Sequence, residues 1–211
     1  MAGTKEAKLG KFAFLGPASV GKSTLTDIYK ERFEGNAKVL VLEEGAQLFF
    51  HELTDADRMR MHTTEMQANI QKFVLEREQR AFHGDLELMI CDRSVLDPVV
   101  YAAYYQGKES ASILLDNIQH WLPTYTSFFL LDPQGIPNDP GPFRREKPED
   151  RLALFDSFRE ILSKYNLPHL VIRGSLAERI AAVDAHIYES TGSILIFNHG
   201  AKGEPSLPVT G

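Results

Sequence analysis

Eight consecutive residues near the N-terminus have the types and the spacing that hold a triphosphate. They run from Gly16 to Ser23, match the pattern G-x-x-x-x-G-K-[ST], and are followed by Thr24. Glycines let the backbone curl so that successive N–H groups point at phosphate oxygens, and a helix beginning at Ser23 adds the positive end of its dipole. Lys22 would reach the β and γ phosphates, while the Ser23 hydroxyl would ligate Mg²⁺. The expected ATP contacts are Gly16, Ala18, Ser19, Val20, Gly21, Lys22, Ser23 and Thr24.

Such a loop works between a strand and a helix, and the chain predicts these elements in alternation. Short apolar runs predict five strands, at residues 11–15, 38–42, 88–91, 127–131 and 169–172. Longer amphipathic stretches predict helices at about 23–33, 54–82, 95–105, 109–121, from 148 onward, and 177–188. Strands that alternate with helices indicate a mostly parallel sheet covered on both faces. We therefore expect an α/β chain with the three-layer P-loop NTPase fold, a five-stranded sheet and a lid loop.

Acidic residues follow two of the predicted strands, at the edge of the sheet where ligands bind in parallel α/β folds. Asp92 follows the strand at 88–91 and suits the acid that organises the Mg²⁺ hydration shell, with Arg93 beside it to keep the carboxylate ionised. A structural Asp–Arg pair at a helix start is the alternative. Glu44, after the strand at 38–42, could position or deprotonate an acceptor hydroxyl, or could simply begin a helix.

A Pro/Gly-rich segment at about 132–147 separates the last two strands and predicts a lid long enough to close over ATP. Arg144 and Arg145 lie in this segment. From a closed lid, arginine would neutralise charge on the transferred phosphoryl group and help to keep water out. A solvated basic turn is the alternative.

Composition places the chain among ordinary globular proteins. Its 211 residues are 43% hydrophobic and 25% charged, which excludes a disordered chain and predicts one domain, residues 1–192. Residues 193–211 read as a C-terminal extension, with a possible edge strand and then a flexible tail. The formal net charge of −6 argues against a general attraction to nucleic acid. A single cysteine and the lack of a long apolar run favour a cytoplasmic protein without a membrane span.

Taken together, these motifs resemble the P-loop nucleoside and nucleotide kinases, and within them the small AAA-type group typified by the ribosylnicotinamide kinase domain of NadR. The resemblance runs over about residues 11–188. EEGAQ is similar to a Glu-x-Ala-Arg signature with Glu44 as the acid, although Gln47 stands where relatives carry arginine. DRSVLDPVVY resembles a D-R-x-x-x-D-x-x-x-Y element, and its first residues also resemble the D-R of thymidylate kinases and the E-R-S of deoxynucleoside kinases. IRGSLAERI, with Gly174, resembles the element beside the adenine, and NDPGPFR a lid segment.

The expected function is an ATP-dependent phosphotransferase that moves the γ-phosphate of MgATP to a nucleoside-like small molecule of ribosylnicotinamide or deoxynucleoside type. Lys22, Glu44, Asp92 and Arg93, with the two lid arginines, would be the catalytic set, and Ser23 and Asp92 the metal ligands.

Three alternatives stay open. A nucleoside monophosphate kinase would need extra arginines, for which Arg58, Arg60 or Arg77 could serve. A kinase acting on a base or a 5′ end in DNA or RNA would need a local basic channel. A regulatory switch with slow NTP hydrolysis would need no acceptor pocket. The oligomeric state is left open.

Overall fold

The computed structural model describes residues 9–45, 49, 60–82, 85–137 and 147–192. Its strands are β1 (Gly10–Leu15), β2 (Val39–Leu42), β3 (Leu88–Asp92), β4 (Ser127–Leu131) and β5 (His169–Ile172). Its helices are α1 (Lys22–Arg32), α4 (Thr64–Ala81), α5 (Asp97–Gln106), α6 (Lys108–Ile118), α7 (Pro148–Lys164) and α8 (Leu176–Thr191), with a 3-10 turn η1 (Leu122–Thr124) before β4. No helix in these ranges is long and apolar enough to cross a membrane.

The sheet is parallel throughout and has the strand order β2-β3-β1-β4-β5. The central strand β1 pairs with β3 through Phe12 and Ile90, and with β4 through Phe12 and Ser127. All residues of β1, β3 and β4 are buried, because helices cover both faces, and this explains their nearly continuous apolar sequences. The predicted α/β fold with five strands is confirmed.

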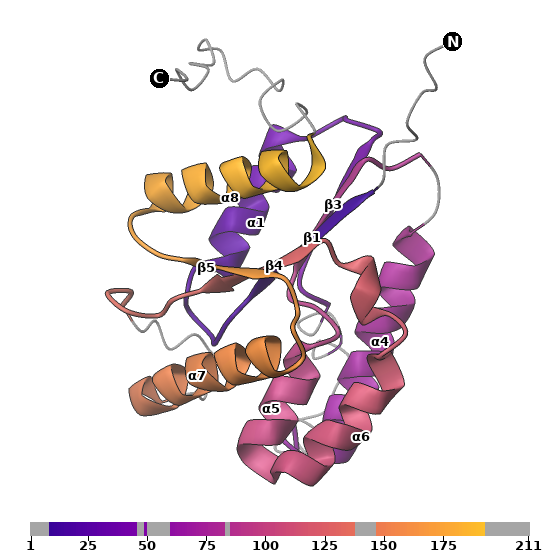
Figure 1. Cartoon of the computed structure of the whole chain (residues 1–211), viewed down its shortest axis with the longest axis vertical. Helices are drawn as coiled ribbons and strands as arrows, with labels where there is room; N and C mark the ends of the chain where they lie inside the picture. Colours follow the sequence, from indigo (N-terminus) through magenta and orange to yellow (C-terminus); the bar gives the residue numbers. More distant parts are fainter. Residues whose placement is uncertain (1–8, 46–48, 50–59, 83–84, 138–146, 193–211) are drawn as a thin grey trace.

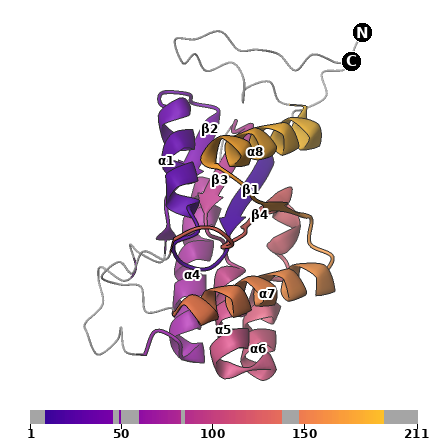
Figure 2. The ribbon, with the colours of Figure 1, turned by 90° about the vertical axis from the view of Figure 1, so that its left-hand side faces the viewer.

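Successive residues of β1 supply the two halves of the core, because side chains of a strand alternate between its faces. Phe12 and Phe14 belong to a cluster with residues of α1 and α8, whereas Ala13 and Leu15 belong to a larger cluster with residues of α4, α5, α6 and α7. Figures 1 and 2 show the corresponding layers, with α1 and α8 on one side of the sheet and the other four helices on the opposite side. The carboxyl ends of the strands are thereby left for the loops that carry the site.

The predicted helix at 54–82 differs from the structure in its first part. Residues 60–63 form a turn, and α4 begins only after Thr63. The Thr63 hydroxyl accepts a hydrogen bond from the Met66 N–H at 3.3 Å, so this threonine satisfies an amide of the first turn and acts as the N-cap. The helix start predicted near residue 54 lies outside the described residues. So do most of the predicted lid, at 138–146, and the extension at 193–211.

Candidate functional site

The loop between β1 and α1 has the curled backbone that the glycine pattern predicts. Gly16 has φ +134°, Ser19 has φ +59° and Gly21 has φ +92°. A Cβ atom on Gly16 would lie 3.0 Å from the Leu131 carbonyl oxygen, so a side chain there would collide with the end of β4. The loop therefore packs directly on the sheet, and Gly21 leads straight into the first turn of α1.

The Lys22 side chain folds back into this loop. Its Nζ donates to the carbonyl oxygens of Gly16 at 2.8 Å and Pro17 at 2.6 Å, and the residue is only 5% exposed. Burial, and then the charge of Arg93, lower the pKa of Lys22 to about 8, although Asp92 and Glu44 act in the opposite direction. The ammonium group is thus largely shielded from water, and among the described residues no carboxylate contacts it directly. An incoming phosphate would stabilise a cation in this state.

Asp92 ends β3 beside the loop, with its carboxyl group buried. Its side chain hydrogen-bonds with Ser23, and its Oδ1 has no hydrogen-bond partner among the described residues. Burial, and then Glu44, raise its pKa to about 6, against the opposing effects of Lys22 and Arg93. Arg93 thus favours the ionised form of Asp92, as the sequence predicts, but burial has the larger effect and keeps the pKa above its ordinary value.

The Arg93 guanidinium group joins two other carboxylates instead. Nε donates to Glu44 Oε1 at 2.5 Å, and Nη1 donates to Asp97 Oδ1 at 3.1 Å. Asp97 also accepts from the Ser94 N–H at 2.8 Å, which fixes the turn after β3. Arg93 itself has φ +67°, and its N–H donates to the Phe14 carbonyl of β1 at 3.0 Å. This Glu44–Arg93–Asp97 network ties together the ends of β2 and β3 and the start of α5.

The structure brings together most of the residues predicted for the site. Lys22, Ser23, Glu44, Asp92 and Arg93 form one electrostatic cluster at the carboxyl ends of β1, β2 and β3. Among the loop positions, Ala18 and Val20 are buried, and Thr24 is exposed on the first turn of α1. Arg144, Arg145 and Gln47 lie outside the described residues.

Gly174 lies between β5 and α8, where the chain turns with φ +89°. A Cβ atom there would lie 2.6 Å from Glu178 Oε2, because the Ser175–Glu178 capping box closes the start of α8 over the glycine. The Gly174 carbonyl accepts from Arg179, whose guanidinium group also reaches the phosphate-binding loop.

Three residues at the site received no role from the sequence. Asp97 holds Arg93, while Arg151 and Arg179 donate to carbonyl oxygens of the phosphate-binding loop. The D-R-x-x-x-D spacing was a usable signal for Asp97. Arg179 lies within the IRGSLAERI element, but the contacts of both arginines with the loop are revealed only by the packing of α7 and α8.

The donor set fits Mg²⁺ better than a metal held by protein alone. No group of three or more His, Cys, Asp or Glu side chains in the described ranges could hold an ion. One hydroxyl and one buried carboxylate with an unpartnered oxygen are what a magnesium ion needs when phosphates and water supply its other ligands.

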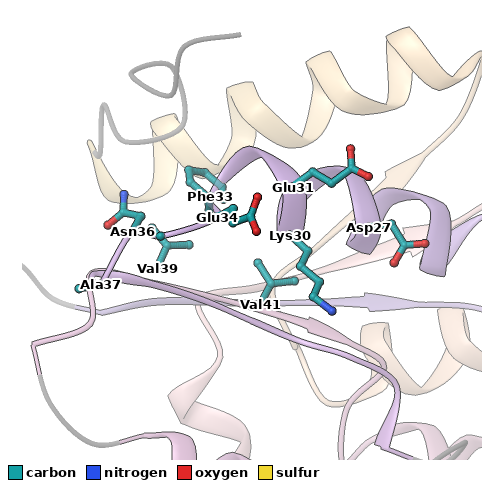
Figure 3. A pocket seen from close by; sticks show the side chains of 10 residues that line it. Asp27, Lys30, Glu31, Phe33, Glu34, Asn36, Ala37, Val39 and Val41 are labelled. Carbon is teal, nitrogen blue, oxygen red and sulfur yellow. The ribbon is translucent and has the colours of Figure 1, made fainter.

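A separate groove of about 750 Å³ runs between α1 and β2. Figure 3 shows its walls, with Asp27, Lys30 and Glu31 from α1 and Val39 and Val41 from β2. None of the cluster residues lines it. The groove is thus distinct from the site at the strand ends.

Comparisons with known proteins agree with this fold. Residues 11–179 match the family described as an AAA domain, and no curated protein matches the sequence. The crystal structure of NadR protein in complex with NAD and AMP-PNP superposes with a TM-score of 0.65 at 18% identity, covering 88% of this chain and 50% of that chain. A NadR complex with NR gives the same TM-score at 19% identity. The chain thus spans about half the length of these NadR chains.

Deoxyadenosine kinase from M. mycoides with bound dATP gives a TM-score of 0.57 at 14% identity, covering 84% of this chain and 98% of that chain. These likenesses establish the fold that the chain shares with P-loop kinases. The family match spans most of the sequence and includes the phosphate-binding loop and the Asp92–Arg93 element. The chain belongs to the AAA domain family and has a P-loop kinase fold of the NadR type.

Proposed function

We propose that the protein is an ATP-dependent phosphotransferase that moves the γ-phosphate of MgATP to a hydroxyl group of a nucleoside-like small molecule that carries no phosphate group. The observation that carries the proposal is the position of the Glu44–Arg93–Asp97 network, which places an oriented carboxylate within electrostatic reach of Lys22. A site that only binds or slowly hydrolyses a nucleotide has no need of a second carboxylate fixed in this way.

The phosphate-binding loop would hold the triphosphate. A backbone curled in this way can direct its N–H groups inward, and α1, which begins at Lys22, would add the positive end of its dipole. The Lys22 ammonium group, held by the Gly16 and Pro17 carbonyls, would turn to the β and γ phosphates and regain the charge stabilisation that burial removes.

Ser23 and Asp92 would hold the magnesium ion that accompanies ATP. When bound, such an ion neutralises charge on the β and γ phosphates. Asp92 must be ionised for this role, and its cost of ionisation in the ligand-free protein reflects burial and the neighbouring Glu44. The protein thus keeps a carboxylate in a dry place that a cation would stabilise.

Glu44 would receive the acceptor. Its carboxylate can accept a hydrogen bond from the attacking hydroxyl group, or take its proton as the phosphoryl group is transferred. Arg93 fixes one carboxylate oxygen, and Asp97 fixes Arg93, so the other Glu44 oxygen keeps a defined direction. This orientation should raise the rate of phosphoryl transfer, because the reacting groups must be aligned before transfer.

The charges of the described residues favour an acceptor without a phosphate group. Arg93 is already paired with two carboxylates, and Arg77 donates to the Glu43 carbonyl at 3.1 Å. Arg60 pairs with Glu65 in an exposed ion pair. A nucleoside monophosphate would need a cation for its own phosphate that these three side chains, as arranged, do not supply. Arg58, which could also serve the monophosphate kinase alternative, lies outside the described residues.

A transfer assay with terminally labelled ATP tests the proposal. Purified protein would be incubated with nucleosides including ribosylnicotinamide, with their monophosphates, and with DNA oligonucleotides. We expect the label in a nucleoside, and loss of that transfer in Glu44→Gln but not in the neighbouring, exposed Glu43→Gln. Label only in monophosphates or DNA, or ATP consumed without any labelled acceptor, would contradict it.

A further inference from the structure

The carbonyl groups of the phosphate-binding loop need donors as much as its N–H groups need phosphate. Where a peptide unit of the loop turns its N–H group inward, its carbonyl oxygen points outward, and buried carbonyls are nearly always hydrogen-bonded. Lys22 serves the carbonyls of Gly16 and Pro17. The carbonyls of Ser19 and Val20 are served from elsewhere, by two arginines of the C-terminal helices.

Arg179, on α8, connects three separate segments with one guanidinium group. Nη1 donates to the Val20 carbonyl at 2.8 Å, Nη2 to the Asp132 carbonyl at 3.0 Å, and Nε to the Gly174 carbonyl at 2.9 Å. The residue is 4% exposed. The loop, the end of β4 and the end of β5 are thus held at a fixed distance from one another by a single planar group.

Arg151, near the start of α7, makes a second connection of this kind. Its Nη2 donates to the Ser19 carbonyl at 3.1 Å, and its Nη1 donates to the Ile136 carbonyl at 3.3 Å. Ser19 is the non-glycine residue of the loop with a positive φ, +59°, a conformation that costs free energy unless its surroundings hold it. The hydrogen bond from Arg151 to the Ser19 carbonyl can stabilise this conformation.

We propose that Arg151 and Arg179 are positioning residues for the nucleotide. They hold the Ser19 and Val20 carbonyls outward, so that the loop amides face the triphosphate before it binds. The proposal rests on the proposed function only in taking this loop as the triphosphate site. Two guanidinium groups behind the loop also add positive potential toward a polyanion.

The geometry requires arginine rather than any cation. Arginine carries five N–H donors in a rigid planar fork, whereas lysine is a compact point charge. One ammonium group at residue 179 would keep the charge but would not reach three carbonyls on three segments. The proposal therefore predicts that Arg179→Lys fails to restore what Arg179→Met loses, and this separates geometry from charge.

Calorimetric titration of the full chain with AMP-PNP and Mg²⁺ tests the proposal. We expect Arg179→Met to raise the Kd about tenfold or more, Arg179→Lys to remain at least about fivefold weaker than the unaltered chain, and Arg151→Met to raise it about three- to tenfold, in line with the loss of one to three hydrogen bonds at a preorganised site. Phosphoryl transfer is not measured, so failure to find an acceptor leaves the result valid.

Two matched arginine variants control for general loss of stability. Arg32 ties α1 to Asp184 of α8 at 2.8 Å, and Arg159 lies on α7 in an exposed pair with Asp156. Arg32→Met and Arg159→Met should lower or leave the melting temperature but change the Kd by less than about twofold, since neither side chain contacts the loop. Equal weakening by Arg32→Met and Arg179→Met would overturn the proposal, as would a folded Arg179→Met that binds like the unaltered chain.

Amide hydrogen exchange in the ligand-free protein gives a second readout. We expect the N–H groups of residues 18–22 to exchange faster in Arg179→Lys and Arg151→Lys, while the strands of the sheet keep their protection. This measurement decides the proposal even if Arg179→Met does not fold, or if the unaltered chain does not bind AMP-PNP. In the latter case the proposed function fails, and unchanged exchange in the lysine variants would sink this proposal separately.

Discussion

Two buried lysines at opposite ends of the central strand show how differently one side chain can be used. Lys11, at the start of β1, has its Nζ 2.6 Å from Glu78 Oε2, 3.1 Å from Thr124 Oγ1 and 3.8 Å from the centre of the Tyr125 ring. Lys22, beyond the carboxyl end of the same strand, contacts two carbonyl oxygens and, within the part of the chain that the structure describes, no carboxylate directly.

The charges of Lys11 and its partner Glu78 are fully satisfied by their surroundings. Glu78 also accepts from Trp121 Nε1 at 2.8 Å and from the Tyr125 hydroxyl, so both charges are hydrogen-bonded and enclosed by aromatic rings. Lys22 has a lowered pKa because burial is not compensated. A fully paired buried cation stabilises structure, whereas an incompletely paired one is prepared for an anion from outside.

The largest expected effect separates the two lysines by activity. Lys22→Ala should reduce phosphoryl transfer by more than about a hundredfold, because it removes the charge contact to the β and γ phosphates. Its melting temperature should stay equal or rise, since an uncompensated buried charge is gone. Steady-state kinetics with a parallel thermal melt would check this. Normal turnover in Lys22→Ala would refute the site.

Lys11→Met should show the opposite pattern. It leaves the buried Glu78 carboxylate without its cation, which costs about 3–5 kcal/mol of unfolding free energy, while kcat per folded molecule stays unchanged. Urea denaturation with an active-site titration measures both. The double variant Lys11→Met with Glu78→Gln should recover part of the stability. A Lys11→Met protein as stable as the unaltered one would contradict the stabilising role assigned to Lys11.

Glu44→Gln tests the role of Glu44 toward the acceptor hydroxyl group. Loss of the carboxylate that orients or deprotonates the hydroxyl should lower kcat by about a hundredfold and leave the KM for ATP nearly unchanged. Glu43→Gln is the matched control, because Glu43 is the adjacent residue, is half-exposed and pairs with Lys30 outside the cluster. A loss shared equally by the two variants, or a rise confined to the KM for ATP, would argue against the assigned role.

Asp92→Asn should lower activity and raise stability, and the gain in stability should depend on pH. The folded-state pKa of about 6 lies above the ordinary aspartate value of 3.8, so the folded protein holds a proton that the unfolded chain releases between these two pH values. The stability cost of the carboxylate thus grows as pH rises through this window and is complete above about pH 6. Asp92→Asn should then gain about 1–3 kcal/mol at pH 8 and nothing below pH 4, while magnesium-dependent turnover falls.

The same carboxyl group sets an acid limit on nucleotide binding. Affinity for AMP-PNP with Mg²⁺ should weaken as pH falls below about 6 in the unaltered chain and lose this dependence in Asp92→Asn. Calorimetry at pH 5, 6 and 7.5 would reveal the difference. Identical pH profiles in the two proteins would show that Asp92 does not organise the metal.

Features that depend on residues close together in the sequence could be predicted, whereas features that depend on distant residues could not. The phosphate-binding loop lies within nine consecutive residues, so its glycines and lysine could be read directly, and the buried strands β1, β3 and β4 showed themselves as apolar runs. Asp92, Arg93 and Glu44 were located because the ends of parallel strands share one edge. The sequence did not predict how strongly these groups interact, because burial raises the Asp92 pKa by more than the adjacent arginine lowers it.

The supports of the site escaped prediction for the same reason. Arg179 meets the Val20 carbonyl across 159 positions of sequence, and Arg151 meets the Ser19 carbonyl across 132. An arginine on an amphipathic helix is ordinarily a surface residue, so nothing local marks these two as buried. The start of α4 was misplaced because the Thr63 cap and the preceding turn carry no break in the apolar spacing.

Phosphorus NMR of the protein mixed with MgATP and a nucleoside tests the central assignment most directly. With the incompletely paired Lys22 in place, a phosphomonoester resonance should grow as the ATP γ-phosphate resonance declines, and neither change should occur in Lys22→Ala. Growth of inorganic phosphate alone, or a phosphomonoester formed equally well without the Lys22 ammonium group, would contradict the account.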